Sequence, residues 1–174
     1  MMNTDKKYTP MPPRELPVSD NQRVVPAAHP YRHYINLQTR FTDYDMLGHL
    51  NNNVYMSFMD LGKAEYFTRV MKGEVDWSNP GIVVVNVNCD YLAPVVPGEE
   101  LELFTTVTKI GERSLTLDQR IINSDTGETK CIARTVMAGF DAETSTSTLI
   151  PTEWVEAIEA YEERSYERKS TLRK

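Results

Sequence analysis

The chain has 174 residues, of which 40% are hydrophobic and 25% charged, a composition typical of one soluble globular domain. Its formal net charge of -6 argues against general nucleic-acid binding, which requires a surplus of lysine and arginine. No apolar stretch approaches the ~20 residues that a membrane span needs, and the polar start, Met1 to Lys7, lacks the apolar region of a signal peptide. We therefore expect a cytoplasmic protein with neither nucleic-acid nor membrane partners.

Residues 1–30 form a separate, proline-rich segment. Proline fixes the backbone φ angle and removes an amide donor, so this segment is expected to be extended rather than helical. Two alternatives remain open for it, a disordered leader and an arm laid across a neighbouring subunit. Residues 31–174 are expected to form the folded domain.

The first half of that domain predicts a strand, a turn and a long helix. A weak period-two pattern indicates a strand over residues 33–41, and the polar residues 42–53 indicate a turn. Apolar residues cover well over half the circumference of a helix predicted over 54–71, which is typical of a helix enclosed by other elements. Asparagines at 51–53 are suitable N-cap residues, and Gly73 is a suitable C-terminal signal.

The second half predicts four strands and a final helix. The strands are expected over residues 82–91, 101–110, 114–123 and 129–140. Short turn signals between them predict an antiparallel meander. A charged helix with a thin apolar stripe is predicted from about 152 to 168, on the surface. The order indicates an α+β fold in which one sheet wraps a single helix. Such a sheet leaves an exposed edge, so we expect pairing into a dimer.

The two cysteines, Cys89 and Cys131, belong to no Cys-x-x-Cys pair and have no histidine at metal-ligand spacing. Both fall inside predicted strands. We therefore expect small, buried or half-buried residues rather than a disulfide or a metal site.

Residues 40–55, read as Arg-Phe-Thr-Asp-Tyr-Asp-Met-Leu-Gly-His-Leu-Asn-Asn-Asn-Val-Tyr, resemble the hotdog-fold thioesterases, especially the 4-hydroxybenzoyl-CoA thioesterase-like group. The shared pattern is an acidic residue, a short spacer, Gly-His-hydrophobic-Asn-Asn, and a tyrosine on the helix. Residues 90–95 and 97–101 resemble the exit from the family's second strand and the turn into its third. The resemblance spans about residues 31–140.

This resemblance implies a hotdog fold, in which an antiparallel sheet wraps a long central helix, here with an extra C-terminal surface helix from about residue 152. It also implies hydrolysis of an acyl-CoA thioester to a free carboxylic acid and CoA, with no cofactor and no metal. The expected assembly is a homodimer or a homotetramer. The acyl group and the choice between CoA and acyl-carrier-protein thioesters stay open.

Four residues are implied to be catalytic. Asp45 matches the family's catalytic carboxylate, acting as a nucleophile or as a general base. The backbone amide of Asn52, at the start of the helix, matches the oxyanion donor. Gly48 would allow close approach of the substrate, and His49 would polarise the carbonyl or orient water. The alternatives are a turn-capping role for Asp45 and a structural role for His49.

Four further residues are candidates for substrate binding: Asn51, Tyr55, Asp60 and Arg113. The side chain of Asn51 is better suited to capping the helix than to catalysis, and Tyr55 is better suited to packing. Asp60 lies among apolar helix residues and therefore needs a partner, in the loop before the helix or in another subunit. Arg113 is a possible contact for the CoA phosphates.

Competing functions are weighed on the same residues. A hydratase is disfavoured because Leu47 occupies the place of the usual asparagine and no proline follows. A metal site built from Asp43, Asp45 and His49 lacks a further ligand. A non-catalytic acyl-CoA-binding hotdog protein would not need Asp45 and remains the main alternative to an enzyme.

Overall fold

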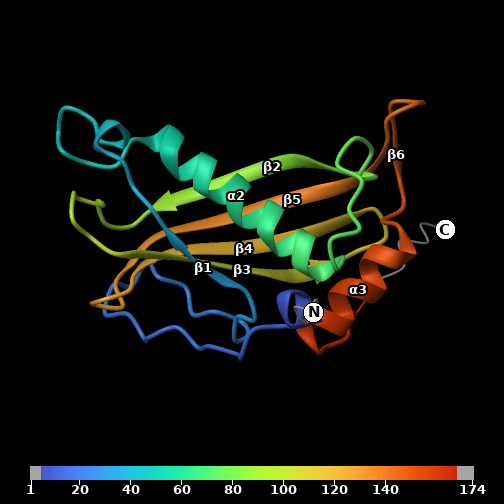
Figure 1. Cartoon of the computed structure of the whole chain (residues 1–174), viewed down its shortest axis with the longest axis horizontal. Coiled ribbons are helices and arrows are strands. Elements are labelled where there is room, and N and C mark those ends of the chain that lie inside the picture. The colour runs from blue at the N-terminus through green and yellow to red at the C-terminus, as the bar shows by residue number, and fades with distance from the viewer. Residues whose placement is uncertain (1–4, 168–174) are drawn as a thin grey trace.

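The computed structural model describes residues 5–167, and Figure 1 shows one long helix lying across one face of an antiparallel six-stranded sheet. Residues 1–4 of the predicted arm and 168–174 of the predicted domain lie outside the described residues. The helices are α1 (Asp5–Tyr8), η1 (Phe41–Asp43, a 3-10 turn), α2 (Asn52–Val70) and α3 (Thr152–Glu162). The strands are β1 (Tyr34–Leu37), β2 (Ile82–Tyr91), β3 (Leu101–Ile110), β4 (Ser114–Asn123), β5 (Thr129–Asp141) and β6 (Thr146–Thr148).

Helix α2 begins and ends at the residues that local chemistry favours. The side chain of Asn51 accepts a hydrogen bond from the amide of Asn53, which is a standard N-cap. At the other end Lys72 takes a left-handed conformation, with φ of 53°. The amide of Gly73 then donates to the carbonyl of Thr68 over 2.8 Å. This is the Schellman arrangement that closes helices, and it confirms the predicted stop near Gly73.

One side of α2 packs tightly on the sheet. Gly62 faces β3 so closely that an added Cβ would lie 2.5 Å from Cδ2 of Leu103. The buried amide of Gln119, on β4, donates to the carbonyl of Met59 over 3.0 Å. The other side of α2 remains exposed and includes Leu61. The sequence predicts a helix enclosed by other elements, but within the described residues α2 is covered only on its sheet side.

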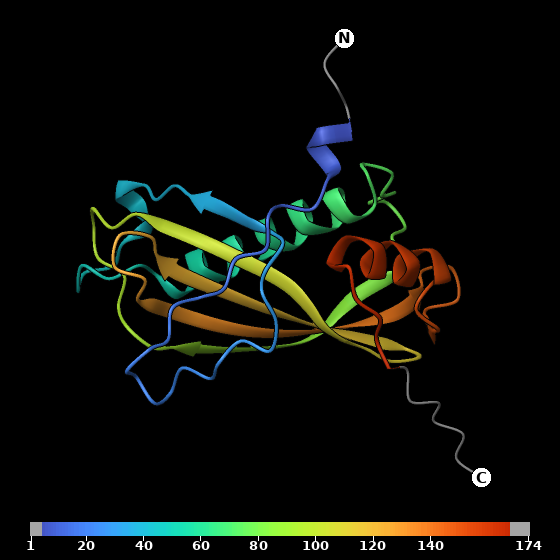
Figure 2. The ribbon, with the colours of Figure 1, turned by 90° about the horizontal axis from the view of Figure 1, so that it is seen from below.

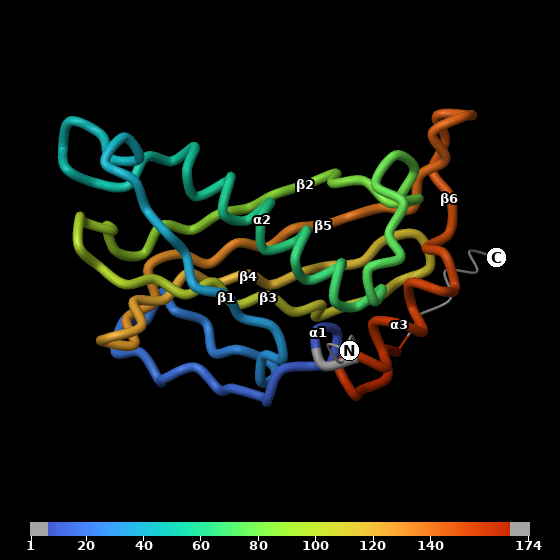
Figure 3. The backbone as a smooth tube through the Cα atoms, in the orientation of Figure 1, coloured from blue at the N-terminus to red at the C-terminus, as the bar shows by residue number. Residues whose placement is uncertain are grey.

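The strand order is β1-β3-β4-β5-β2, with β6 paired to the end of β5. The predicted meander is therefore wrong at one strand, because β2 pairs with β5 and not with β3. The connection over residues 92–100 is too long for a tight hairpin, and Figure 3 shows it running from one side of the sheet to the other. Strands β3, β4 and β5 do form the predicted consecutive hairpins.

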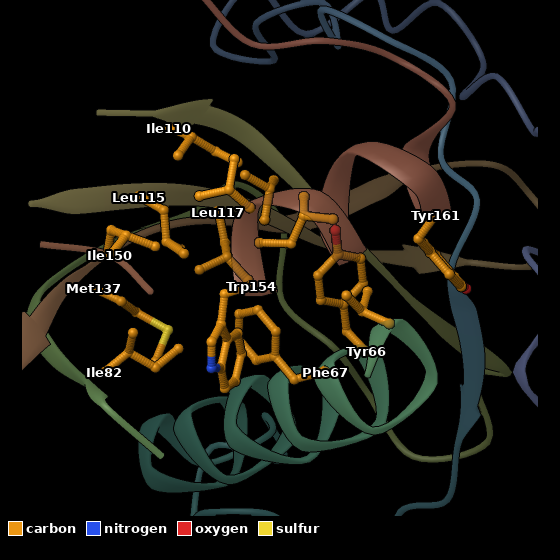
Figure 4. Packing of buried hydrophobic residues seen from close by; sticks show 14 residues of the cluster. Tyr66, Phe67, Ile82, Ile110, Leu115, Leu117, Met137, Ile150, Trp154 and Tyr161 are labelled. Atoms are coloured by element: carbon orange, nitrogen blue, oxygen red, sulfur yellow. The ribbon is translucent and has the colours of Figure 1, made fainter. Parts of the chain in front are cut away.

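The largest apolar cluster lies between the C-terminal half of α2, the sheet and α3. Figure 4 shows Phe67 of α2 facing Trp154 of α3, with ring centroids 4.9 Å apart. The stripe predicted on the last helix is buried here, and its members are Trp154, Val155, Ile158 and Tyr161. A second cluster, around Tyr55 and Met59, fills the N-terminal half of α2. The long helix therefore packs on its sheet through two clusters, one at each half of the helix, as the hotdog prediction requires.

The two long edges of the sheet differ. Strand β1 pairs with β3 only as far as Phe104. Beyond that point α3 lies against β3, and Tyr166 donates a hydrogen bond to the backbone carbonyl of Val107. On the opposite edge, no described strand pairs with the free side of β2. Exposed strand edges are templates for pairing with another chain.

The described part of the arm, residues 5–30, lies along its own sheet. Figure 2 shows it passing the β3 edge and looping below the sheet, whereas α2 lies above. Arg14 donates two hydrogen bonds to Glu102 over 2.8 and 3.0 Å and exchanges backbone hydrogen bonds with Tyr31. Arg120 of β4 donates to the carbonyl of Val25. Within residues 5–167 no helix is both long and apolar enough to cross a membrane.

Candidate active site

The segment that carries the family-like motif folds into a small hairpin. Tyr44 and Leu50 pair as an antiparallel bridge, and the amide of Gly48 donates to the carbonyl of Asp45 over 3.0 Å. Gly48 has a φ of 72°, a left-handed conformation that glycine adopts at no steric cost. An aspartate at the first position and a glycine at the fourth are the residues that this turn favours. The local sequence therefore dictates the hairpin.

The carboxylate of Asp45 is held by the hairpin. Its Oδ1 atom accepts hydrogen bonds from the amides of Leu47 and His49, over 2.8 and 3.1 Å. Within the described residues its Oδ2 atom has no hydrogen-bond partner, and the residue is exposed. The turn-capping role and the chemical role are thus compatible, because one oxygen fixes the orientation while the other faces outward.

Directly after the hairpin, the first turn of α2 presents an unused amide. The side chain of Asn51 caps the amide of Asn53, and the backbone carbonyl of Asn51 accepts from Val54. The amide of Asn52 has no partner among the described residues. The first turn contains no acidic side chain, so no carboxylate competes for the positive end of the helix dipole. An anionic oxygen can therefore be bound here.

Backbone hydrogen bonds join the hairpin to its surroundings. The amide of Asn51 donates to the carbonyl of Asp43 over 2.8 Å, and the amide of Leu50 donates to the carbonyl of Val95 over 2.9 Å. The carboxylate of Asp43 in turn accepts from the amide of Arg40. Asp45, Gly48, His49 and Asn52 consequently belong to one connected unit, which Figure 1 shows at the N-terminal end of α2.

His49 and Tyr55 occupy different environments beside this unit. His49 is half-buried, and its ring makes no hydrogen bond within the described residues. Tyr55 is only 3% exposed, and its ring meets that of Tyr91 edge-on, with centroids 5.0 Å apart. Burial raises the pKa of Tyr55 to about 12, so its hydroxyl is neutral near pH 7. Tyr55 therefore packs in the core next to this unit.

Asp60 and Arg113 are not brought into this unit. Asp60 lies on the exposed side of α2, with a side chain 76% accessible, and pairs with Lys63 over 2.7 Å. Its partner is therefore a neighbour on the same helix and not the preceding loop. Arg113 follows the end of β3 farthest from the hairpin, and its guanidinium donates to the carbonyl of Ser147. The substrate-binding role of Arg113 receives no support from this position in the isolated chain.

One contact was not expected from sequence, since the carbonyl of Val95 fixes the hairpin through Leu50. The ring of Tyr91, which lies in the family-like stretch 90–95, packs against Tyr55. The flanking prolines Pro94 and Pro97 are the only local signal for the extended conformation of this connection.

Elsewhere, an open cavity of about 860 Å³ lies between α1, the end of α2 and α3, at the other end of the helix from the hairpin. Within residues 5–167 no group of three metal-ligating side chains converges.

Comparisons with known proteins agree with this arrangement. Residues 47–130 match the model of the thioesterase superfamily, a range that contains Gly48, His49 and Asn52 and begins just after Asp45. The uncharacterized protein YsmA of Bacillus subtilis (strain 168) is 34% identical over 82 residues, which are 47% of this chain and 54% of that protein. The alignment thus spans about half the length of that curated relative.

Two solved structures are similar over most of their own length. A thioesterase from Thermus thermophilus, crystallised with coenzyme A and Zn, is 29% identical, with a TM-score of 0.67 over 75% of this chain and 94% of that one. The PA5185 protein from Pseudomonas aeruginosa strain PAO1 is 27% identical, with a TM-score of 0.66 over 79% and 95% of the two chains.

A long helix on an antiparallel sheet, with the hairpin at the helix N-terminus, defines a protein of the hotdog-fold class. Over residues 47–130 the chain is similar to the thioesterase superfamily. The family match and the similar Thermus thermophilus thioesterase indicate a thioester hydrolase.

Proposed function

We propose that this protein hydrolyses an acyl-CoA thioester to a carboxylic acid and free CoA, at the site formed by the hairpin and the start of α2. Support for CoA as the carrier comes from the similar Thermus thermophilus thioesterase, which was crystallised with coenzyme A. The single observation that carries the proposal is the amide of Asn52, which has no partner among the described residues and lies directly after a hairpin that orients the carboxylate of Asp45.

The proposed chemistry follows from these two groups. The thioester carbonyl oxygen accepts a hydrogen bond from the Asn52 amide, which becomes stronger as negative charge develops on that oxygen. The free oxygen of Asp45 either attacks the carbonyl carbon, giving a mixed anhydride, or removes a proton from an attacking water. In the first route the thiolate of CoA leaves and takes a proton from solvent, and water then hydrolyses the anhydride, which releases the carboxylic acid and regenerates Asp45. In the second route the water oxygen bonds to the carbonyl carbon, the C–S bond breaks, and the leaving thiolate takes up the proton that Asp45 removed. His49 is proposed to orient the carbonyl or the water.

The first experiment measures thiol release from acyl-CoAs of graded chain length and from acyl-carrier-protein thioesters. The Asp45→Asn variant should lower kcat/KM by roughly 10²–10⁴-fold, because an amide retains the turn-capping oxygen but is neither nucleophile nor base. Asp141→Asn is the matched control, because Asp141 also accepts two backbone amides, from Glu143 and Thr144, at the far end of β5. Equal activity in the two variants would refute the role of Asp45.

The panel also separates the alternatives. Release only from carrier-protein thioesters would identify an acyl-carrier-protein thioesterase. Tight binding of acyl-CoA without release would identify a non-catalytic binding protein. Reductive trapping with borohydride during turnover distinguishes the two routes for Asp45, since a mixed anhydride at its carboxylate is converted to homoserine, which mass spectrometry detects.

We further propose that two copies pair through the free edge of β2. The support is the unpaired edge itself and the exposed valines on this strand, which include Val85 at 57% accessibility. Pairing would place the exposed side of α2, with Leu61 and Asp60, near the second copy. Light scattering should give a dimer for the unmodified protein and a monomer for Val85→Arg. A monomer in both would refute this interface.

A further inference from the structure

The two cysteines lie next to each other, although 42 positions separate them in the sequence. Cys89 is on β2 and Cys131 on β5, and their Sγ atoms are 3.1 Å apart. Both are free thiols. A disulfide requires its sulfurs about 2 Å apart, so a shift of about 1 Å separates these thiols from a covalent bond.

The strand register determines how that shift can occur. Cys89 is paired with Ala133, and Cys131 with Tyr91, so the two cysteines are diagonal rather than directly opposite. Diagonal neighbours are farther apart than opposite ones, and closing the bond therefore requires β2 to move slightly against β5. Strand β2 can move against β5 because the register of this strand pair is interrupted between Val84 and Asn86.

The two thiols have unequal access and unequal acidity. Cys131 is fully buried, whereas Cys89 is half-buried. The contact with the Cys131 thiol lowers the pKa of Cys89, although burial of Cys89 opposes this effect. The same contact and its own burial raise the pKa of Cys131. Since the thiolate is the reactive form, Cys89 is the thiol that meets an oxidant first, and Cys131 is the resolving partner.

We propose that Cys89 and Cys131 are a reversible dithiol–disulfide pair that is oxidised by a peroxide. The Cys89 thiolate attacks one peroxide oxygen, the O–O bond breaks, and hydroxide leaves, which gives a sulfenic acid at Cys89. The sulfur of Cys131 then attacks the sulfenic sulfur, its proton is lost, and water leaves as the S–S bond forms. Two thiols are oxidised and one peroxide is reduced to two waters. A small oxidant suits the half-buried position of Cys89.

The experiment treats the native protein with an equimolar amount of hydrogen peroxide. The protein is then denatured in the presence of N-ethylmaleimide, which blocks the remaining free thiols, and is digested and analysed by mass spectrometry. Both thiols should disappear together, a peptide pair linked through Cys89 and Cys131 should appear, and dithiothreitol should restore both thiols. Over-oxidation of Cys89 without this link, a Cys89–Cys89 link between chains, or two unreacted thiols would each overturn the proposal.

Single variants test the order of the two steps. Cys131→Ser should stop at a sulfenic acid on Cys89, which dimedone traps, and Cys131→Ala should do the same if serine is not tolerated in the core. Cys89→Ser should leave Cys131 reduced, because its sulfur is buried. Oxidation of Cys131 in that variant at the rate seen in the unmodified protein would contradict the assignment of Cys89 as the first thiol to react.

Discussion

The close contact between Gly62 and the sheet predicts whether Gly62→Ala raises or lowers the free energy of unfolding. Glycine inside an exposed helix is destabilising relative to alanine by about 1 kcal/mol, so propensity alone predicts that Gly62→Ala stabilises the protein. The structure predicts the opposite. The added methyl group would lie 2.5 Å from Cδ2 of Leu103, 2.9 Å from Nε2 of Gln119 and 3.1 Å from Oγ1 of Thr105.

The magnitude follows from what must move. Leu103 and Gln119 are both fully buried, and overpacking of this kind costs about 1–3 kcal/mol. Displacement of Gln119 also weakens its hydrogen bond to the carbonyl of Met59, worth about 1 kcal/mol. After subtracting the gain in helix propensity, we expect Gly62→Ala to lower the free energy of unfolding by about 1–3 kcal/mol.

Urea unfolding, followed by circular dichroism and tryptophan fluorescence, measures this difference. Ala64→Gly is the matched control, because Ala64 is exposed on the other side of the same helix and reports propensity alone, a loss of about 1 kcal/mol. The reasoning would be refuted if Gly62→Ala raised stability by as much as Ala64→Gly lowers it. That result would mean that the helix and the sheet can move apart without any loss of packing free energy.

Three further predictions use other parts of the fold. Lys72→Gly should raise the free energy of unfolding by about 0.5–1 kcal/mol in the same urea assay, since the left-handed residue after α2 would lose its Cβ strain. Burial, and then the nearby charge of Arg69, lower the pKa of His33 from 6.5 to about 3. Between pH 6.5 and 3 the unfolded chain therefore binds a proton at His33 that the folded chain does not bind. The free energy of unfolding should fall as the pH drops through this range. Thermal melts at several pH values should show that His33→Phe lacks this contribution to the pH dependence. Arg14→Ala removes the two hydrogen bonds to Glu102, and limited proteolysis should then cut the arm several-fold faster, whereas unchanged cleavage would contradict its role as an anchor.

The sequence predicts the bounds of the helices and strands better than it predicts which strands pair with each other. The bounds of β2, β3 and β4 agree with the structure because alternation and turn residues are local signals. The very short α1 and β6 were not predicted, since they have too few residues for a period to be detected. The pairing of β2 with β5 depends on the path of residues 92–100 across the sheet, which no local pattern encodes.

The same distinction applies to the site. The turn at Asp45 and the N-cap at Asn51 follow from local residue preferences, and the structure confirms both. The left-handed conformation of Gly48 is a structural finding that the same preferences explain. Arg113 shows the limit of such reasoning. Its charge is visible in the sequence, but the strand register decides at which end of the sheet it lies. The chemical roles of Asp45, His49 and Asn52 stay predictions until activity is measured.

The contacts of the arm with the sheet limit how far the chain can be shortened from its N-terminal side. Phe104 and Ile122 lie on the sheet face away from α2, and together with Tyr31 they form a small buried cluster that Leu16 and Ala27 of the arm cover. Glu102 and Arg120 find arm partners on that same face. A chain shortened to begin at residue 31 would expose these groups to water. The described part of the arm, residues 5–30, therefore packs against the hotdog domain rather than standing apart from it.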